Sequence, residues 1–361
     1  MKRGLRTGFT TGACAAAAAK AATRVLARNA ILSQIETTLP NRSRVTFVLS
    51  RCEHLGAHAL ASIIKDAGDD PDCTHGAELV AEVELRAEPG IELRSGPGVA
   101  TVTKAGLGLP VGAPAINPVP RRNITEMVEE ELVATPYRGA VVTISVPLGE
   151  EMAKKTSNAR LGLLGGISIL GTSGIVQPYS TAAWKASVVQ EIDVAAAAGL
   201  DELVLTTGGK SEQYAMALHP HLPEQAFIQV GDFIGVGVRQ CARRAVRTAI
   251  VVGMIGKLSK MAKGRMQTHA AGSDVDLGFL AALAAELGGS DPLVAGIRQA
   301  NTARHVLELC RDAGLLAITA LICRKVAETC AQHAGGRLAV RAYLVDFGGA
   351  LLGRHPVEGS P

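Results

Sequence analysis

The alternation of short apolar segments with helical segments in the second half of the chain constrains the fold most. Apolar runs at 165–170, 201–207, 226–230 and 249–255 are each followed by a helical or glycine-rich segment. Strands of a parallel sheet are buried on both faces and are joined by helices, so they appear as continuous apolar runs of this kind. We therefore expect a mostly parallel sheet here, with a last strand at 339–347.

The first half of the chain shows a different pattern. Residues 44–50 and 78–86 alternate apolar and polar side chains, which predicts strands, and 139–148 predicts a further strand. Residues 58–65 are compatible with a short helix or a strand, and the alanine-rich stretch at 12–29 predicts a helix.

These patterns predict an α/β protein with two domains. We expect an α+β domain over residues 1–150, followed by an α/β domain with a mostly parallel sheet over 160–361. The boundary is expected between residues 149 and 163. A chain of 361 residues is long enough for two such cores.

Composition narrows the class of protein. No apolar run approaches the ~20 residues of a membrane span, so no membrane partner is expected. Aromatic residues make up 3% and the net charge is +4, without basic tracts, which argues against nucleic acid as a partner. The seven cysteines are scattered without a CxxC pair, which favours a reducing compartment, and we expect a cytoplasmic protein.

Two glycine-containing turns follow predicted strands of the second half. In open parallel sheets such turns lie at the carboxyl ends of strands, where ligands bind. The predicted cofactor-binding residues are Gly171, Thr172, Ser173, Gly174, Thr206, Thr207, Gly208, Gly209 and Asp232. The alternative is that the turns use Gly and Thr for geometry alone, and that Asp232 is an N-cap. Neither turn is a G-x-G-x-x-G fingerprint.

Thr10 and Thr11 lead into the alanine-rich helix. Free backbone N–H groups at a helix N-terminus can bind a carboxylate. The alternative is simple N-capping by threonine, which needs no ligand.

The acidic segment KDAGDDPDCTHG at 65–76 is the most unusual short stretch. Crowded carboxylates raise one another's proton affinity, so one of them could act as a base near neutral pH. The candidates are Asp66, Asp69, Asp70, Asp72 and His75. A solvated acidic turn is the alternative. Metal binding is poorly supported, because the spacing matches no calcium loop or zinc site, and no metal is expected.

Five longer stretches together resemble one family. They are LRTGFTTGACAAAAAKAA (5–22), IKDAGDDPDCTHG (64–76), GPGVATVTKAGLGLPVGAPAINPVPRRNI (96–124), GISILGTSGIVQPYS (166–180) and GKLSKMAKGRMQTHA (256–270). This combination resembles the cobalt-precorrin-5B C(1)-methyltransferase family of cobalamin biosynthesis. The resemblance implies an enzyme that uses S-adenosylmethionine to methylate carbon 1 of a cobalt-containing tetrapyrrole, giving cobalt-precorrin-6A.

The resemblance also gives several residues an expected role. The substrate carries many carboxylates, which suit Arg, Lys and helix N-termini, so we expect Thr10, Thr11, Lys65, Arg121 and Arg122 to bind it. Two other classes remain open from the residues: a nicotinamide-dependent oxidoreductase and a non-catalytic tetrapyrrole carrier.

Overall fold

The structure, a computed structural model, describes residues 4–269 and 274–356. The chain divides into two compact units, Met1–Thr181 and Ala182–Pro361. The division therefore falls later than the boundary expected between 149 and 163. The reason is that residues beyond 163 form short strands with segments near the N-terminus of the chain, as described below.

The first unit contains small strands and three helices within its described residues. Its elements are β1 (Gly8–Phe9), α1 (Thr11–Arg28), β2 (Gln34–Thr38), β3 (Arg44–Val48), β4 (Arg51–Leu55), β5 (His58–Ile64), β6 (Glu78–Arg86), β7 (Gly90–Ser95), β8 (Gly98–Val99), β9 (Thr101–Val102), α2 (Pro118–Leu132), β10 (Gly139–Ser145), α3 (Gly149–Ala153), β11 (Leu163–Leu164), β12 (Gly166–Ile167) and β13 (Ile175–Val176).

The main sheet of the first unit has the strand order β4-β5-β6-β10-β7. Its neighbours are antiparallel, except that β10 and β7 run parallel. The segment 58–65, compatible with either helix or strand by sequence, is the strand β5. The predicted α+β character of this part of the chain is confirmed.

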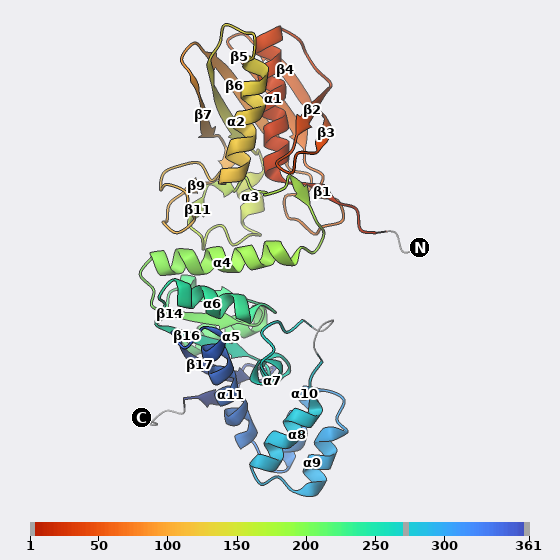
Figure 1. Cartoon of the computed structure of the whole chain (residues 1–361), viewed down its shortest axis with the longest axis vertical. Coiled ribbons are helices and arrows are strands. Elements are labelled where there is room, and N and C mark those ends of the chain that lie inside the picture. The colour runs from red at the N-terminus through yellow and green to blue at the C-terminus, as the bar shows by residue number, and fades with distance from the viewer. Residues whose placement is uncertain (1–3, 270–273, 357–361) are drawn as a thin grey trace. The chain divides into compact units, whose positions relative to one another are not determined.

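Helices α1 and α2 lie side by side on one face of this sheet (Figure 1). The alanine side chains of α1 are buried, and their small size lets the helix approach β5 and β6 closely. The helix begins after the N-cap Thr10 and ends at Arg28, and its C-cap Asn29 has φ of 49°. A C-terminal residue in this left-handed conformation is a common helix stop.

Charged side chains lie between α1 and α2. Lys20 Nζ is 2.9 Å from Glu130 Oε1 and 4.0 Å from Glu131 Oε1, and Arg24 Nε donates to Glu131 Oε2 at 2.8 Å. The side chains of Lys20 and Glu131 are only 4% and 1% exposed. Since isolated buried charges are costly, each of these groups depends on its partners.

Short strands within residues 163–176 pair with earlier strands of the first unit. β13 pairs with β1, β12 pairs with β8, and β11 pairs with β9. An isolated bridge joins Ile116 to Ile169. The segment 165–170, expected as the first strand of the second domain, therefore belongs to the first unit. Its partners lie far away in sequence, which is why periodicity alone misplaced it.

The elements of the chain from residue 181 onward alternate strands and helices. They are α4 (Thr181–Ala197), β14 (Glu202–Thr206), α5 (Gly209–Leu218), the 3₁₀ helix η1 (Glu224–Ala226), β15 (Phe227–Gln229), α6 (Ile234–Arg243), β16 (Thr248–Gly253), α7 (Ile255–Ala262), α8 (Leu277–Glu286), α9 (Asp291–Arg298), α10 (Ala303–Asp312), α11 (Ala317–His333), β17 (Ala339–Val345) and β18 (Leu351–His355).

The sheet of the second unit has the order β15-β14-β16-β17-β18. The first four strands are parallel, and β18 is antiparallel to β17. The predicted mostly parallel sheet is confirmed, and the antiparallel β18 was not expected. The chain leaves β14 toward one edge and then crosses back to β16, so the strand order reverses between these two strands. Ligands of open α/β sheets bind beside such a point, at the carboxyl ends of the strands.

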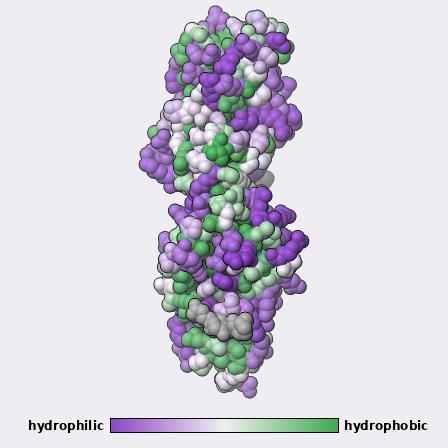
Figure 2. All heavy atoms as spheres, turned by 90° about the vertical axis from the view of Figure 1, so that its left-hand side faces the viewer, coloured by the Kyte–Doolittle hydropathy of each residue, from purple (hydrophilic) through white to green (hydrophobic). Residues whose placement is uncertain are grey.

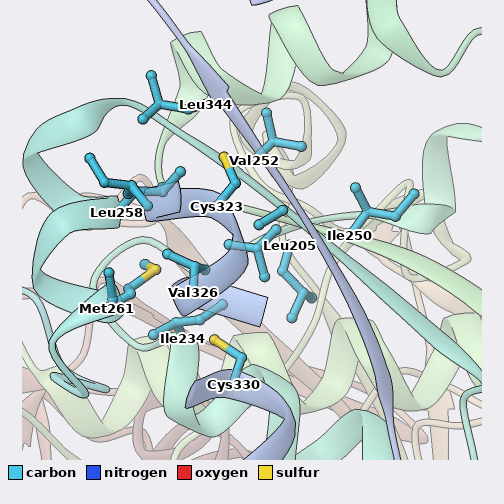
Figure 3. Packing of buried hydrophobic residues seen from close by; sticks show 14 of the residues in the cluster. Leu205, Ile234, Ile250, Val252, Leu258, Met261, Cys323, Val326, Cys330 and Leu344 are labelled. Atoms are coloured by element: carbon cyan, nitrogen blue, oxygen red, sulfur yellow. The ribbon is translucent and has the colours of Figure 1, made fainter. Parts of the chain in front are cut away.

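The core of the second unit packs helices against this sheet. Figure 3 shows Cys323, Val326 and Cys330 of α11 near strand residues such as Leu205 and Val252, all in one buried cluster. The three α11 residues are spaced to lie on one face of the helix. Burial raises the pKa values of the Cys323 and Cys330 thiols to about 12, so these cysteines are packing residues.

The molecular surface is mixed in polarity on the face drawn in Figure 2, where hydrophilic residues alternate with smaller hydrophobic areas. None of the helices within the described residues combines the length and the hydropathy that a membrane crossing requires.

Candidate active site

The motifs of the first unit converge at one end of α1. The Phe9 N–H donates to the Asp66 carbonyl at 2.8 Å, and the Asp69 N–H donates to the Arg6 carbonyl at 2.9 Å. The Tyr179 N–H donates to Asp70 Oδ1 at 2.8 Å. The acidic loop therefore contacts both the segment before α1 and the segment after β13, although these are separated by more than 100 residues of sequence.

Asp66 forms an ion pair with Arg6. Arg6 donates from both terminal guanidinium nitrogens, Nη1 to Asp66 Oδ2 and Nη2 to Asp66 Oδ1 at 3.0 Å, and the Gly68 N–H donates to Oδ1 at 2.9 Å. The hydrogen bonds from Arg6 and Gly68 lower the pKa of Asp66 to about 2. A carboxylate held in its ionised form in this way is a poor base near neutral pH.

Lys65 and Asp72 form an ion pair within the acidic loop. Lys65 Nζ donates to Asp72 Oδ2 at 2.6 Å, and the N–H and hydroxyl of Thr74 donate to Asp72 Oδ1 at 2.7 and 2.6 Å. Burial acts to raise the pKa of Asp72, but the hydrogen bonds from Lys65 and Thr74 outweigh it and lower the pKa. The Lys65 side chain is 1% exposed, so its ammonium group pairs with Asp72 inside the loop.

The sequence argument that crowding raises proton affinity is therefore wrong for Asp66 and Asp72. Each forms an ion pair with a cationic side chain, and this ion pair affects the pKa of the carboxyl group more than the neighbouring carboxylates do. Asp69 is exposed and Asp70 is half-buried, and each accepts one backbone N–H, from Arg6 and Tyr179 respectively. These two carboxylates remain accessible at the surface of the loop.

His75 is also exposed, and its Nδ1 accepts the Ala67 N–H at 3.1 Å. Of the four carboxylates among the five predicted base candidates, Asp69 and Asp70 are the two that form no ion pair within the described residues.

Thr10 and Thr11 serve the structure of the first unit. Thr10 Oγ1 caps α1 by accepting the Ala13 N–H at 3.2 Å, and Thr11 Oγ1 accepts the Leu170 N–H at 2.9 Å. Both residues are buried. The capping alternative considered from sequence is therefore observed for Thr10, and both hydroxyls are used within the protein.

Arg121 and Arg122 lie in the first turn and a half of α2. Gly12 of α1 lies so close to Pro120 that an added Cβ would be 2.7 Å from its ring, so the N-termini of the two helices adjoin each other. Arg121 is half-buried and Arg122 is exposed. Among the described residues no carboxylate oxygen forms an ion pair with either guanidinium. The two arginines thus offer cationic groups beside two helix N-termini.

The loop Gly171–Gly174 lies in the first unit and packs against the start of α1. A Cβ on Gly171 would be 2.4 Å from Thr10 Oγ1, and the Thr10 N–H donates to the Gly174 carbonyl at 3.0 Å. Ser173 accepts the Asn41 N–H through its carbonyl at 3.3 Å, while Thr172 is exposed. The sequence placed this loop and the 206–209 loop in one domain. They lie in different units.

The loop 206–209 follows β14 and lies at the carboxyl edge of the second sheet. Thr206 is fully buried, and the Thr207 hydroxyl is 3.3 Å from Ser211 Oγ in α5. Gly208 precedes α5 with φ 162° and ψ 170°, an extended conformation. A Cβ on Gly208 would meet no heavy atom of the described residues within 4 Å, whereas one on Gly209 would be 3.3 Å from Gln229 Nε2. The edge therefore has open space at Gly208.

Asp232 lies beside this loop and connects three segments. Its Oδ1 accepts the Thr268 hydroxyl at 2.9 Å and is 3.0 Å from Lys257 Nζ, which also donates to the Thr207 carbonyl at 2.8 Å. Burial acts to raise the pKa of Asp232, but the hydrogen bonds from Lys257 and Thr268 lower it. Asp232 is thus an ionised carboxylate at the edge, and it does not cap a helix.

Lys257 is a functional candidate that the sequence reading missed. It lies in α7, directly after β16, so it follows the strand beside β14 on the same edge of the sheet. Nothing in the sequence pattern distinguishes this lysine, because its role depends on Asp232 and Thr207, which lie beside it in space. His269 of the same stretch is exposed. Within the described residues no group of three or more His, Cys, Asp or Glu side chains is arranged to hold a metal ion.

The chain is similar to one known protein family along most of its length. The family described as CbiD matches residues 1–178, and the family described as CbiD, C-terminal domain, matches residues 267–356.

Several curated proteins with the same name match nearly the whole chain. A protein named cobalt-precorrin-5B C(1)-methyltransferase from Leptospira interrogans is 58% identical over 97% of this chain and 95% of its own length. A protein of that name from Rubrobacter xylanophilus is 56% identical over 96% of this chain and 89% of its own length. One from Geobacillus sp. is 49% identical over 98% and 97%.

A solved structure of a cobalamin biosynthesis protein (CbiD) from Archaeoglobus fulgidus is 26% identical, covering 86% of this chain and 85% of that chain with a TM-score of 0.39. A superposition this weak carries no argument, and the fold described above rests on the structure of this chain.

Proposed function

Because this chain belongs to the CbiD family, we propose that it methylates carbon 1 of cobalt-precorrin-5B to give cobalt-precorrin-6A in cobalamin biosynthesis. The observation that carries this proposal is the similarity, over almost the whole chain, to relatives named for that reaction. The same relatives give no support to a nicotinamide-dependent oxidoreductase or to a non-catalytic carrier. The chain is accordingly an enzyme, a C(1)-methyltransferase.

We propose S-adenosylmethionine as the methyl donor, bound at the carboxyl edge of β14 and β16. Support comes from the reversal of strand order at this point, the open space at Gly208 and the ionised carboxylate of Asp232. A sulfonium donor is cationic, so a nearby carboxylate favours its binding, and Lys257 at 3.0 Å from Asp232 Oδ1 offsets part of this attraction. The donor site proposed here uses Thr206, Thr207, Gly208, Gly209 and Asp232. The donor site proposed here does not include the loop Gly171–Gly174, which packs against the start of α1.

We propose that the precorrin substrate is recognised by the first unit. Arg121 and Arg122 have no carboxylate partner among the described residues, and they lie beside the N-termini of α1 and α2. Carboxylates of a tetrapyrrole are natural partners for guanidinium groups. Thr10, Thr11 and Lys65 support this region from within, because their polar atoms are used by the protein itself.

Methyl transfer requires electron density at carbon 1 of the macrocycle, which the loss of a proton elsewhere on the ring supplies. We propose Asp69 or Asp70 as the group that accepts this proton, since both reach the surface of the acidic loop. The protein's larger contribution is to align donor sulfur, methyl carbon and acceptor carbon. Asp66, Asp72 and His75 then shape the loop.

The donor site is tested by titrating the protein with S-adenosylmethionine and S-adenosylhomocysteine. Trp184, the only tryptophan of the chain, lies next to Gly231 and so provides a fluorescence signal beside Asp232. We expect binding by the native chain and its loss in Gly208→Phe, whose side chain would occupy the open space. Unchanged binding in a folded Gly208→Phe variant would refute this donor site.

A further inference from the structure

Lys257 and Asp232 form a pair of opposite charges at the carboxyl edge of the second sheet. The Lys257 and Asp232 side chains are 35% and 22% exposed, so both can be reached by a ligand. Thr268, which is 1% exposed, donates its hydroxyl to the same Oδ1 of Asp232 that Lys257 contacts. The pair is therefore held in place by buried structure and open toward solvent.

Both members of the pair have hydrogen-bonding capacity left. A lysine ammonium has three N–H donors, and Lys257 uses one for the Thr207 carbonyl and one for Asp232. Lys257 and Thr268 both contact Oδ1 of Asp232, and neither uses Oδ2. Within the part of the chain that the structure describes, one cationic donor and one anionic acceptor thus remain for a ligand.

Among the described residues, no atom fills the space at the two glycines next to Lys257 and Thr207. Gly256 immediately precedes Lys257, and Gly208 immediately follows Thr207. A Cβ on either glycine would meet no heavy atom of the described residues within 4 Å. A small ligand can approach both charged groups without displacing a side chain at these positions.

We propose that Lys257 and Asp232 together bind the amino-acid end of the methyl donor. Lys257 donates its third N–H to the α-carboxylate, and Oδ2 of Asp232 accepts from the α-ammonium group. A zwitterion fits a neutral ion pair because its two charges match without leaving a net charge at the site. This inference rests on the proposed function, since it concerns the same donor site, and it adds Lys257 as a ligand-binding residue.

The test compares two ligands that differ only at this end. S-adenosylhomocysteine carries the zwitterion, and 5′-methylthioadenosine lacks it. By isothermal titration we expect the native chain to bind S-adenosylhomocysteine about 100-fold more tightly, the effect of two charge-assisted hydrogen bonds. Lys257→Gln is expected to reduce affinity for S-adenosylhomocysteine about 10-fold and to leave 5′-methylthioadenosine binding unchanged.

A decarboxylated analogue of S-adenosylhomocysteine, which keeps the amine alone, sharpens this test. The native chain and Lys257→Gln are expected to bind it equally, because the carboxylate that Lys257 contacts is absent. Asp232→Asn is expected to weaken it. If Asp232→Asn fails to fold, the result with Lys257→Gln alone decides the test. The Lys257 side chain is more exposed than the Asp232 side chain.

Lys263→Gln is the matched control. Lys263 pairs with Asp276 at the end of the same helix, so its substitution removes an ion pair without touching the proposed site. It should leave all affinities unchanged. Equal losses of both ligands in Lys257→Gln, or no loss of S-adenosylhomocysteine, would overturn this inference while leaving the donor site standing. If the native chain binds neither ligand, the proposed donor site fails together with it.

Discussion

The buried charges between α1 and α2 depend on Glu131. This carboxylate is 1% exposed and faces both Lys20 and Arg24. Glu131→Ala leaves the buried Lys20 with only the more exposed Glu130 as its partner, so we expect the free energy of unfolding to fall by about 3–5 kcal/mol. Chemical denaturation of the native chain and the variant measures this difference.

Glu129 supplies the control for that substitution. It is exposed on the same helix, so Glu129→Ala should change the free energy of unfolding by no more than about 0.5 kcal/mol. Equal effects of the two substitutions would contradict the account of Glu131 as a buried counter-charge.

Asp66 predicts a pH dependence of stability. Its pKa is lowered to about 2 by Arg6 and Gly68, below the roughly 3.9 of an unfolded aspartate. The folded state therefore gains stability from this group at pH values above about 4, and the gain is lost as the pH falls through about 2. Because the pair is partly exposed, we expect at most about 1 kcal/mol.

The stability difference between the native chain and Asp66→Asn, followed from neutral to acid pH, checks this prediction. The difference should be constant above pH 4 and should shrink at lower pH. A difference that grows as the pH falls would contradict it.

At the scale of elements, the acidic loop touches β1 and the residues just before it, backbone to backbone. A Cβ on Gly68, which has φ of 69°, would be 2.2 Å from the Arg6 carbonyl oxygen. Gly76 has a similar φ of 76°, but a Cβ there would meet nothing within 4 Å among the described residues. The two glycines thus share one backbone conformation and differ in the space around them.

We therefore expect Gly76→Ala to destabilise the protein by about 1–2 kcal/mol through its backbone conformation alone. Gly68→Ala should cost more and should reduce methyl transfer, because it separates the loop from β1. Thermal melting together with an activity assay measures both effects. Similar melting temperatures and activities in the two variants would contradict the close contact.

Elements with strong periodicity could be predicted from the sequence. The alternation in β6 and the apolar runs of β14 and β16 reflect burial on one face or on both faces, which is a local property of a strand. β12 and β13 contain two residues each, and their partners β8 and β1 lie far back in the chain. Such pairing is decided by tertiary contacts, so local pattern could not place them.

Many residues of the candidate site could be predicted from the sequence, but their arrangement in space could not. Sequence located the acidic loop and the turn after β14, because both contain unusual local residues. It could not show that Lys65 is buried against Asp72, or that Arg6 holds Asp66 ionised, since both facts depend on packing. Lys257 was missed because a lysine in a helix carries no signal until its neighbours in space are known.

At the scale of the whole molecule, the division at residue 181 predicts how fragments behave. A fragment of residues 1–181 contains every strand partner of the first unit and its buried core. A fragment of residues 1–160 lacks β11, β12 and β13, so β9, β8 and β1 lose their partners. We expect the longer fragment to melt cooperatively and the shorter one to melt at a lower temperature or without cooperativity.

Circular dichroism melts of both fragments check this expectation. A cooperative transition of the 1–160 fragment at the temperature of the 1–181 fragment would contradict the assignment of residues 163–176 to the first unit.

The central claim is that this chain transfers a methyl group to carbon 1 of its substrate. The most direct measurement incubates the chain without oxygen with cobalt-precorrin-5B and S-adenosylmethionine that carries ¹³C in its methyl group, and locates the label in the product by NMR. The account predicts that the ¹³C label lies in the methyl group attached to carbon 1, and that S-adenosylhomocysteine is formed. Folded protein that binds both ligands and yields no labelled product would contradict it and would leave a binding protein in its place.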